Sequence, residues 1–223
     1  MKKPTKAARP STRHTRRWPA SLAVVAVLIL QLLVPTQING LPRWVMPTLG
    51  ALLLLPLIYM NPLHLHRDEP WLRRVELVLL GVLVAANMFY LGGLIYFLDH
   101  GAANQGLVLV KGAVLIWVTN VVAFGVWYWE VDRGGPFARA PEHEREAERA
   151  DLLFPQMTVD LDGWKNWLPG FTDYLYVSFT NATAFSPTDT LPLTARTKVL
   201  MGVESGISLL TVAIVAARAV NVL

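Results

Sequence analysis

The chain alternates between long runs of apolar residues and short polar segments, a pattern that predicts a bundle of membrane helices. A helix needs at least about 17 apolar residues to cross the hydrocarbon core of a bilayer. The first two apolar segments are close to this limit, and the next two exceed it: 18–34, 44–60, 75–98 and 107–129. We therefore expect a four-helix transmembrane region over residues 18–130 and a fifth span at about 193–222.

Residues 171–223 have a different pattern. A short aromatic, amphipathic run, too brief to cross a bilayer, breaks at Ser186-Pro187 and is followed by a Thr-rich turn and the last apolar helix. Non-helical backbone at membrane depth is tolerated only where protein or water satisfies its polar groups. The predicted fold class is an all-α integral membrane protein with about five transmembrane helices. A re-entrant, pore-type half-helix is expected before the last one.

The composition supports a membrane protein, and the charged residues cluster in a few segments of the chain. Hydrophobic residues make up 53% of the chain and charged residues only 16%, whereas a soluble domain typically has about 25% charged residues. Seven of the 20 Lys and Arg residues lie in residues 1–17, which we expect to be a disordered basic tail attracted to anionic lipid rather than to nucleic acid. Nine of the 16 acids lie in 130–162, and 131–170 is predicted to be a polar acidic loop with a short helix at 141–153.

The distribution of Lys and Arg also predicts the orientation of the chain. The tail is strongly basic, and the connector before the third span contains Arg67, Arg73 and Arg74. Cytoplasmic loops carry an excess of these residues, so both segments are expected inside. The N-terminus is then cytoplasmic, segment 131–170 lies inside and the C-terminus outside. The expected location is the inner or plasma membrane, with membrane lipids as partners.

Little in the sequence indicates catalysis. The chain has no cysteine, which excludes disulfides, thiolate catalysis and Cys-based metal sites. His64 and His66, near Asp68 and Glu69, have a spacing that is common by chance and predicts no metal site. Nucleophile–base pairs, phosphate loops and zinc helix motifs are absent from the sequence. We therefore predict no enzyme activity, no cofactor and no bound metal.

Glu204 is the most informative single residue. It lies about ten residues into the last helix, roughly 15 Å along it, and hence near the middle of the bilayer. An ionisable group at this depth is by default a functional hypothesis, facing a cavity or pathway. The alternative is a structural glutamate that ties the last helix to the re-entrant one. Gly202 and Gly206 flank it with the spacing of close helix packing, or they form a gating hinge.

Other polar residues have two interpretations each. Asn87 and Asn120 are expected to form hydrogen bonds between helices. Asp189 with Arg196 and Lys198 predicts a charged rim or a simple interfacial ion pair. The hydroxyl and amide groups of the re-entrant stretch either line a path or satisfy local backbone: Thr180, Asn181, Thr183, Ser186 and Thr188. Trp127-Tyr128-Trp129 is expected to form an aromatic belt.

Phe171, Asp173, Leu175, Tyr176, Ser178 and Phe179 stand in the order F-x-D-x-L-Y-x-S-F. This run matches the pore-helix pattern F-x-D-A-L-Y-F-S-F, and the last 53 residues resemble the pore module of bacterial two-helix tetrameric cation channels. Asp189, Pro192, Glu204 and Ala217-Arg218 match positions in the turn after the filter and in the inner helix. The resemblance implies a pore-lining loop, a tetrameric homo-oligomer and ions as permeant species.

The filter itself departs from the channel pattern T-V-G-Y-G-D. The filter-like positions hold Thr183, Ala184, Phe185, Ser186, Pro187, Thr188 and Asp189, so both glycines are missing. A potassium filter replaces the ion's hydration shell with backbone carbonyls, and its glycines supply positive φ angles. Pro187 fixes φ near −65°. A potassium-selective filter is therefore not expected.

The chain also resembles a family of bacterial membrane proteins of unknown function with the motif D-Y-L-Y-F-S-F-T, matched by residues 173–180. That resemblance implies a similar layout of spans and no activity. The predicted function is a channel-like membrane protein that is non-selective or non-conducting. The alternative is a structural or accessory membrane protein that kept the fold without transport.

Overall fold

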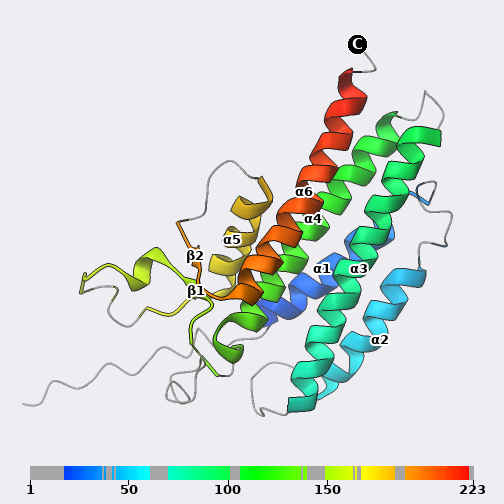
Figure 1. Cartoon of the computed structure of the whole chain (residues 1–223). Coiled ribbons are helices and arrows are strands. Elements are labelled where there is room, and N and C mark those ends of the chain that lie inside the picture. Colours follow the sequence, from blue (N-terminus) through cyan, green and yellow to red (C-terminus); the bar gives the residue numbers. More distant parts are fainter. Residues whose placement is uncertain are drawn as a thin grey trace, which may run out of the picture.

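The computed structural model describes residues 18–36, 38, 42, 44–60, 70–100, 106–136, 138–139, 149–162, 164, 167–183 and 189–220. Six α-helices dominate this part of the chain (Figure 1). They are α1 (Trp18–Leu33), α2 (Val45–Met60), α3 (Pro70–His100), α4 (Gly106–Val131), α5 (Phe171–Thr183) and α6 (Ala195–Val220). Two 3-10 turns, η2 (Asp132–Gly134) and η3 (Pro155–Met157), and two strands, β1 (Leu152–Leu153) and β2 (Leu191–Pro192), complete it.

Among the residues that the structure describes, three helices are long and apolar enough to cross a membrane: Arg73–His100, Gly106–Gly134 and Ala195–Ala217. The apolar helices α1 and α2 have 16 residues each. The apolar runs predicted from the sequence therefore do form helices. The prediction of a mainly helical protein is confirmed, and three of its helices have the length and apolar character that a membrane span needs.

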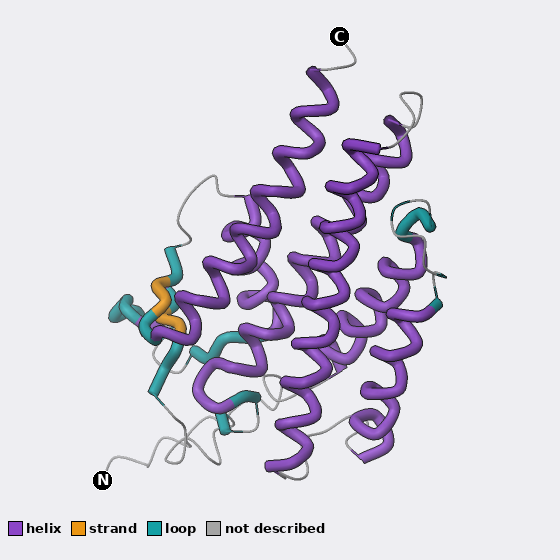
Figure 2. The backbone as a smooth tube through the Cα atoms, turned by 45° about the vertical axis from the view of Figure 1, so that its right-hand side comes forward, coloured by secondary structure: helices purple, strands orange, loops and turns teal. Residues whose placement is uncertain are grey.

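Helix α4 is the centre of the bundle. It packs against α1, α3, α5 and α6, while α2 packs mainly against α3. Side chains on all sides of α4 are buried, among them Phe124, Tyr128 and Trp129. This is expected for a helix that is apolar around its whole circumference. Helices α3, α4 and α6 run alongside one another, with α5 on one side of them and α2 on the other (Figures 1 and 2).

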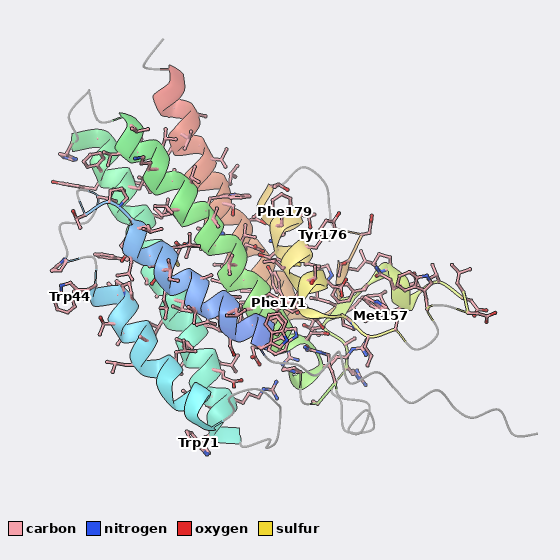
Figure 3. All side chains as sticks on the ribbon, turned by 180° about the vertical axis from the view of Figure 1, so that it is seen from behind. Trp44, Trp71, Met157, Phe171, Tyr176 and Phe179 are labelled. Carbon is pink, nitrogen blue, oxygen red and sulfur yellow. The ribbon has the colours of Figure 1, made fainter. Side chains whose placement is uncertain are left out.

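Helix α5 is short and covers only part of the length of its neighbours (Figure 1). The side chain of Asp173, in its first turn, accepts a hydrogen bond from the backbone N–H of Gly170 at 2.7 Å, and a carboxylate there complements the helix dipole. Tyr174, Val177 and Ser178 form its buried face. Tyr176 and Phe179 point outward (Figure 3).

The segment after α4 folds back onto the chain that precedes α6. Strands β1 and β2 pair antiparallel, with Leu152 opposite Pro192 and Leu153 opposite Leu191. Most of the helix predicted at 141–153 lies outside the described residues, but its end is a strand instead. The cause is a distant carboxylate: Asp132 Oδ1 accepts the N–H groups of Asp151 (2.9 Å) and Leu152 (3.2 Å), which a helix would have used.

Candidate functional site

Glu204 lies at the point where α4, α5 and α6 meet, and it is fully buried, with 0% of its surface exposed. Its Oε1 accepts a hydrogen bond from the Ser178 hydroxyl of α5. Its Oε2 accepts one from Tyr128 Oη of α4 at 2.5 Å and one from Asn181 Nδ2 of α5 at 2.6 Å. We call these four residues the Glu204 cluster. Both carboxyl oxygens are therefore engaged by neighbouring helices.

The helical spacing of the partners explains how the cluster forms. Ser178 and Asn181 are three residues apart on α5 and hence share one face. Asn181 Nδ2 also donates to the Met201 carbonyl (3.0 Å), and Ser205 Oγ donates to Asn181 Oδ1 (3.1 Å). The Ser178 hydroxyl lies 2.7 Å from the Val121 carbonyl of α4. This geometry is that of a glutamate tying the last helix to α5, the structural interpretation of Glu204.

A row of buried carboxamides continues from this cluster across the bundle. Gln31 of α1 donates to the Leu83 carbonyl of α3 (3.4 Å), and Asn87 of α3 donates to the Ile116 carbonyl of α4 (3.2 Å). Asn120 of α4 then donates to Ser208 Oγ (2.9 Å) and to the Glu204 carbonyl (3.0 Å) of α6.

The spacing along this carboxamide row is regular. Leu83 is four residues before Asn87, and Ile116 is four residues before Asn120, so each carbonyl lies one turn from the next carboxamide. The interhelical bonds expected for Asn87 and Asn120 are present. Gln31 was not predicted as part of this row, although a carboxamide within an apolar helix is a signal that could have identified it.

Two local expectations have different outcomes. The Thr180 hydroxyl donates to the Tyr176 carbonyl (2.9 Å), and the Thr183 hydroxyl donates to the Thr180 carbonyl (2.9 Å). Both hydroxyls therefore satisfy local backbone, which was one of their two predicted roles. The aromatic belt at the end of α4 is wrong for two of its three members. Tyr128 and Trp129 are each 1% exposed, because α5 and the segment after α4 cover them.

The close contact between α5 and a neighbouring helix occurs at Gly125 of α4, not at the glycines beside Glu204. A Cβ at Gly125 would lie 3.1 Å from the Leu175 Cα. At Gly202 and Gly206 no heavy atom of the described chain lies within 4 Å of such a Cβ, and both residues are exposed. The packing predicted for these two glycines is therefore not made within the described part of this chain.

This difference yields a prediction. We expect Gly125→Ala to lower the stability of the protein by about 1–3 kcal/mol, because the added methyl group overpacks against backbone that cannot move aside. Gly202→Ala and Gly206→Ala should be neutral or slightly stabilising, since alanine favours helix over glycine by about 1 kcal/mol. Thermal unfolding of the detergent-solubilised protein measures the stability of all three variants. An equal loss of stability in all three variants would contradict the conclusion that close helix packing occurs at Gly125 and not at Gly202 or Gly206.

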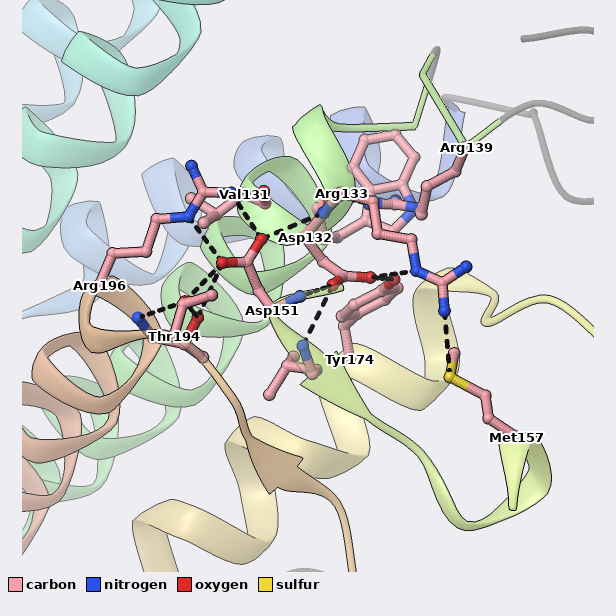
Figure 4. A network of polar contacts seen from close by, with 12 residues as sticks. Val131, Asp132, Arg133, Arg139, Asp151, Met157, Tyr174, Thr194 and Arg196 are labelled. Atoms are coloured by element: carbon pink, nitrogen blue, oxygen red, sulfur yellow. Dashed lines mark hydrogen bonds and ion pairs between the residues drawn. The ribbon is translucent and has the colours of Figure 1, made fainter. Parts of the chain in front are cut away.

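A second polar cluster lies at the end of α4, where the following segment returns to the bundle (Figure 4). The Asp151 side chain is 1% exposed and binds Arg196 through two parallel contacts, Nε to Oδ1 at 2.7 Å and Nη2 to Oδ2 at 2.6 Å. Such bidentate pairs are among the strongest hydrogen-bonded contacts in proteins. Thr194 Oγ1 donates to Oδ1 at 2.5 Å, and the Arg133 backbone N–H donates to Oδ2 at 3.1 Å.

These partners change the acidity of Asp151. Burial alone raises the pKa of the carboxyl, but the hydrogen bonds from Arg196 and Thr194, the Arg196 charge and the Arg133 N–H outweigh burial. The pKa of Asp151 therefore lies below its ordinary value of 3.8. Arg196 thus binds Asp151, 45 residues away in the chain, whereas Asp189 was the partner expected from the sequence. Asp189 is exposed.

Asp132 completes this second cluster. Its Oδ1 accepts the two strand N–H groups, and its Oδ2 accepts the Tyr174 hydroxyl of α5 at 2.7 Å. Arg139 donates to the carbonyls of Asp132 (2.5 Å) and Trp129 (2.8 Å) and lies 5.0 Å above the Tyr174 ring. A cation is favourable at a helix C-terminus. We name these residues the interfacial clamp: Asp132, Arg139, Asp151, Tyr174 and Arg196.

The structure locates only the edges of the filter-like stretch. Thr183 is the last residue of α5, and Asp189 begins the bend before β2. Ala184, Phe185, Ser186, Pro187 and Thr188 lie outside the described residues, as do His64, His66, Asp68 and Glu69. In the part of the chain that the structure describes, no group of three or more His, Asp or Glu residues is placed to hold a metal ion.

Both clusters join segments far apart in the sequence, and both centre on carboxylates whose oxygens are filled by protein donors. Such groups are suited to holding helices together, since their lone pairs are already occupied. No protein-family model, curated protein or solved structure matches the chain.

Proposed function

We propose that the chain is a subunit of a homo-oligomeric, channel-like membrane protein whose pore-type module, made of α4, α5 and α6, does not select potassium. The observation that carries this proposal is the position of α5. At 13 residues it is about 20 Å long, too short to cross a bilayer, and the Glu204 cluster fastens it to the two apolar helices α4 and α6. A half-length helix held between two candidate spans supports the proposal that α5 is a re-entrant segment.

The proposed topology has five spans, with α1 and α2 included and the N-terminus in the cytoplasm. Their 16 residues each give about 24 Å, a few ångströms less than the hydrocarbon core. Short helices are accommodated by local thinning of the bilayer at modest cost. Exposed tryptophans support the inclusion of α2, because Trp44 lies at its start and Trp71 beside its far end (Figure 3).

The surface available to line a path is the outer face of α6. The rest of the chain covers this helix less than it covers the other two candidate spans. Its exposed side chains near Glu204 are apolar: Val199, Val203, Leu209 and Leu210, with Gly202 and Gly206 between them. Apolar constrictions close channels by excluding water. A path lined by this face in an assembly of several copies would therefore be closed at rest.

Flux through liposomes tests the proposal. We expect purified wild-type protein to form a homo-oligomer and to pass little cation, and Val203→Asn to raise cation flux without favouring potassium over sodium, because an amide wets the apolar face. The matched control is Val114→Asn, since Val114 is an exposed valine on α4. A monomeric particle with no flux from either variant would contradict the proposal.

The alternative is a structural or accessory membrane protein. The favouring observation is that Glu204 is fully buried, with both carboxyl oxygens hydrogen-bonded to helices. On that alternative the protein is monomeric, and Val203→Asn changes neither flux nor assembly. The oligomeric state together with the flux of the Val203 variant separates the two functions.

A further inference from the structure

Arg133 differs from every other described residue in its backbone. It is the one non-glycine residue with a positive φ in the part of the chain that the structure describes, at 51°, and Gly134 (80°) and Gly135 (101°) follow it. A left-handed conformation costs an L-residue roughly 1–2 kcal/mol. The turn is held because the Arg133 N–H donates to the buried carboxylate of Asp151 at 3.1 Å. Strained backbone of this kind often serves to position a side chain.

The guanidinium of Arg133 lacks a strong acceptor. Its Nη2 donates to the sulfur of Met157 at 3.1 Å, and its buried Nε has no hydrogen-bond partner. The nearest carboxylate oxygen is Asp132 Oδ2, 4.0 Å from Nε, which already accepts the Tyr174 hydroxyl. A thioether is a weak acceptor, and leaving a largely buried charged donor without an oxygen acceptor is costly.

The other two arginines of this region are bound differently. Arg139 donates to two backbone carbonyls, and Arg196 makes a bidentate contact with Asp151. The side chain of Arg133 instead points away from that pair toward Met157 (Figure 4). The Arg133 side chain keeps 21% of its surface exposed, so it is not closed off from the outside.

The location of Arg133 identifies the kind of acceptor. The apolar span that contains α4 ends at Gly134, which places Arg133 at the level of the lipid headgroups. Trp164, 40% exposed, stacks edge-on with Trp167, which in turn contacts Phe154 next to η3. Tryptophans are enriched at that level of the membrane. The abundant oxygen anion there is the phosphate of a phospholipid.

We propose that Arg133 binds the phosphate group of a phospholipid, with a preference for anionic headgroups. A guanidinium presents paired N–H donors that match two phosphate oxygens, and Met157 covers this fork when no lipid is bound. The preference for anionic lipid follows from the charge of Arg133 itself, because the carboxylate oxygen paired with it, Asp132 Oδ2, is 4.0 Å from Nε and already accepts the Tyr174 hydroxyl.

Lipid titration of the full chain tests this site. Native mass spectrometry would measure retention of phosphatidylglycerol against phosphatidylcholine by the detergent-solubilised protein. We expect Arg133→Gln to weaken retention of phosphatidylglycerol about tenfold, and Arg133→Lys to weaken it less, because lysine keeps the charge but loses the planar fork. The matched control is Arg149→Gln, since Arg149 is an exposed arginine of the same segment, and it should retain lipid as the wild type does.

A second variant and a second ligand serve as controls for the assignment of the site and of its ligand. Met157→Leu removes the sulfur acceptor and keeps the volume, so it should retain phosphatidylglycerol at least as tightly as the wild type. Inorganic phosphate at millimolar concentration should not displace the lipid. Equal losses in the Arg133→Gln and Arg149→Gln variants would overturn the site, and displacement by inorganic phosphate would overturn the lipid as its ligand.

Discussion

Replacing Glu204 with alanine is expected to lower the free energy of unfolding by about 2–5 kcal/mol. The change removes the acceptor that donors on Tyr128, Ser178 and Asn181 share in the interior of the bundle. Ser178 keeps the Val121 carbonyl and Asn181 the Met201 carbonyl as acceptors, so the Tyr128 hydroxyl loses most. Hydrogen bonds between membrane helices contribute about 0.6 kcal/mol on average and up to about 1.7 kcal/mol. The empty volume of the missing side chain adds to this loss. Because the three donors lie on α4 and α5, the loss should loosen α5 from both of its neighbours.

The measurement is thermal or denaturant unfolding in detergent, followed by tryptophan fluorescence. Val203→Ala serves as the control, since Val203 is the neighbouring residue on the exposed side of α6. Glu204→Gln should lie between the two, because its amide turns one oxygen acceptor into a donor that faces other donors. A double-mutant cycle with Tyr128→Phe should show a coupling of about 1 kcal/mol. If Glu204→Ala and Val203→Ala have the same free energy of unfolding, the structural role assigned to Glu204 is wrong.

The second large effect is expected at the interfacial clamp. Arg196→Gln should cost about 3 kcal/mol, because it leaves the Asp151 carboxylate buried without its counter-charge. Asp151→Asn should cost less, since the Arg196 side chain is 44% exposed and can turn to water. The free energies of unfolding of the two variants, measured at neutral pH, test whether losing Arg196 costs more than losing the charge of Asp151. Lys198→Gln is the control, because it removes an exposed cation from the same end of α6.

The ion pair also predicts how stability changes with pH. The folded-state pKa of Asp151 lies below the 3.8 of the unfolded chain, so its contribution is complete above that value and is lost as the pH falls through the folded pKa. The gap in melting temperature between the wild type and Asp151→Asn should therefore be constant from pH 7 to about pH 5 and shrink toward pH 3. A gap that widened on acidification would contradict this assignment.

Much of the fold could be predicted because it depends on local patterns. Apolar runs predicted the positions of α1 to α4 and α6 to within a few residues, and α5 begins at Phe171, as its amphipathic pattern indicated. The hydrogen-bonding roles of Asn87 and Asn120 followed from a similar argument, because a carboxamide in an apolar helix needs a partner. Hydropathy and the need to satisfy polar groups act on each residue separately.

Partners were harder to predict than elements. Tyr128 looked like part of an aromatic belt, yet its hydroxyl binds Glu204, 76 residues further along the chain. Arg196 had Asp189 as the closer carboxylate in sequence, yet it binds Asp151. Leu152 and Leu153 looked helical, but Asp132 captured the N–H groups of Asp151 and Leu152. In each case a residue distant in sequence offered a better-placed group.

By itself, the sequence determined that this is a mainly helical protein with helices long and apolar enough to cross a membrane, and with a short amphipathic helix before the last of them. Apolar length and charge segregation suffice for that conclusion, because they set the cost of each segment in water or lipid. Only the tertiary structure decided that Glu204 is enclosed by three donors and that Gly125 rather than Gly202 or Gly206 permits close packing. It also decided that the Arg133 guanidinium donates to a sulfur, with its Nε left without a hydrogen bond. The physical reason is that burial and hydrogen-bond geometry belong to pairs of helices, and the sequence of one helix does not contain them.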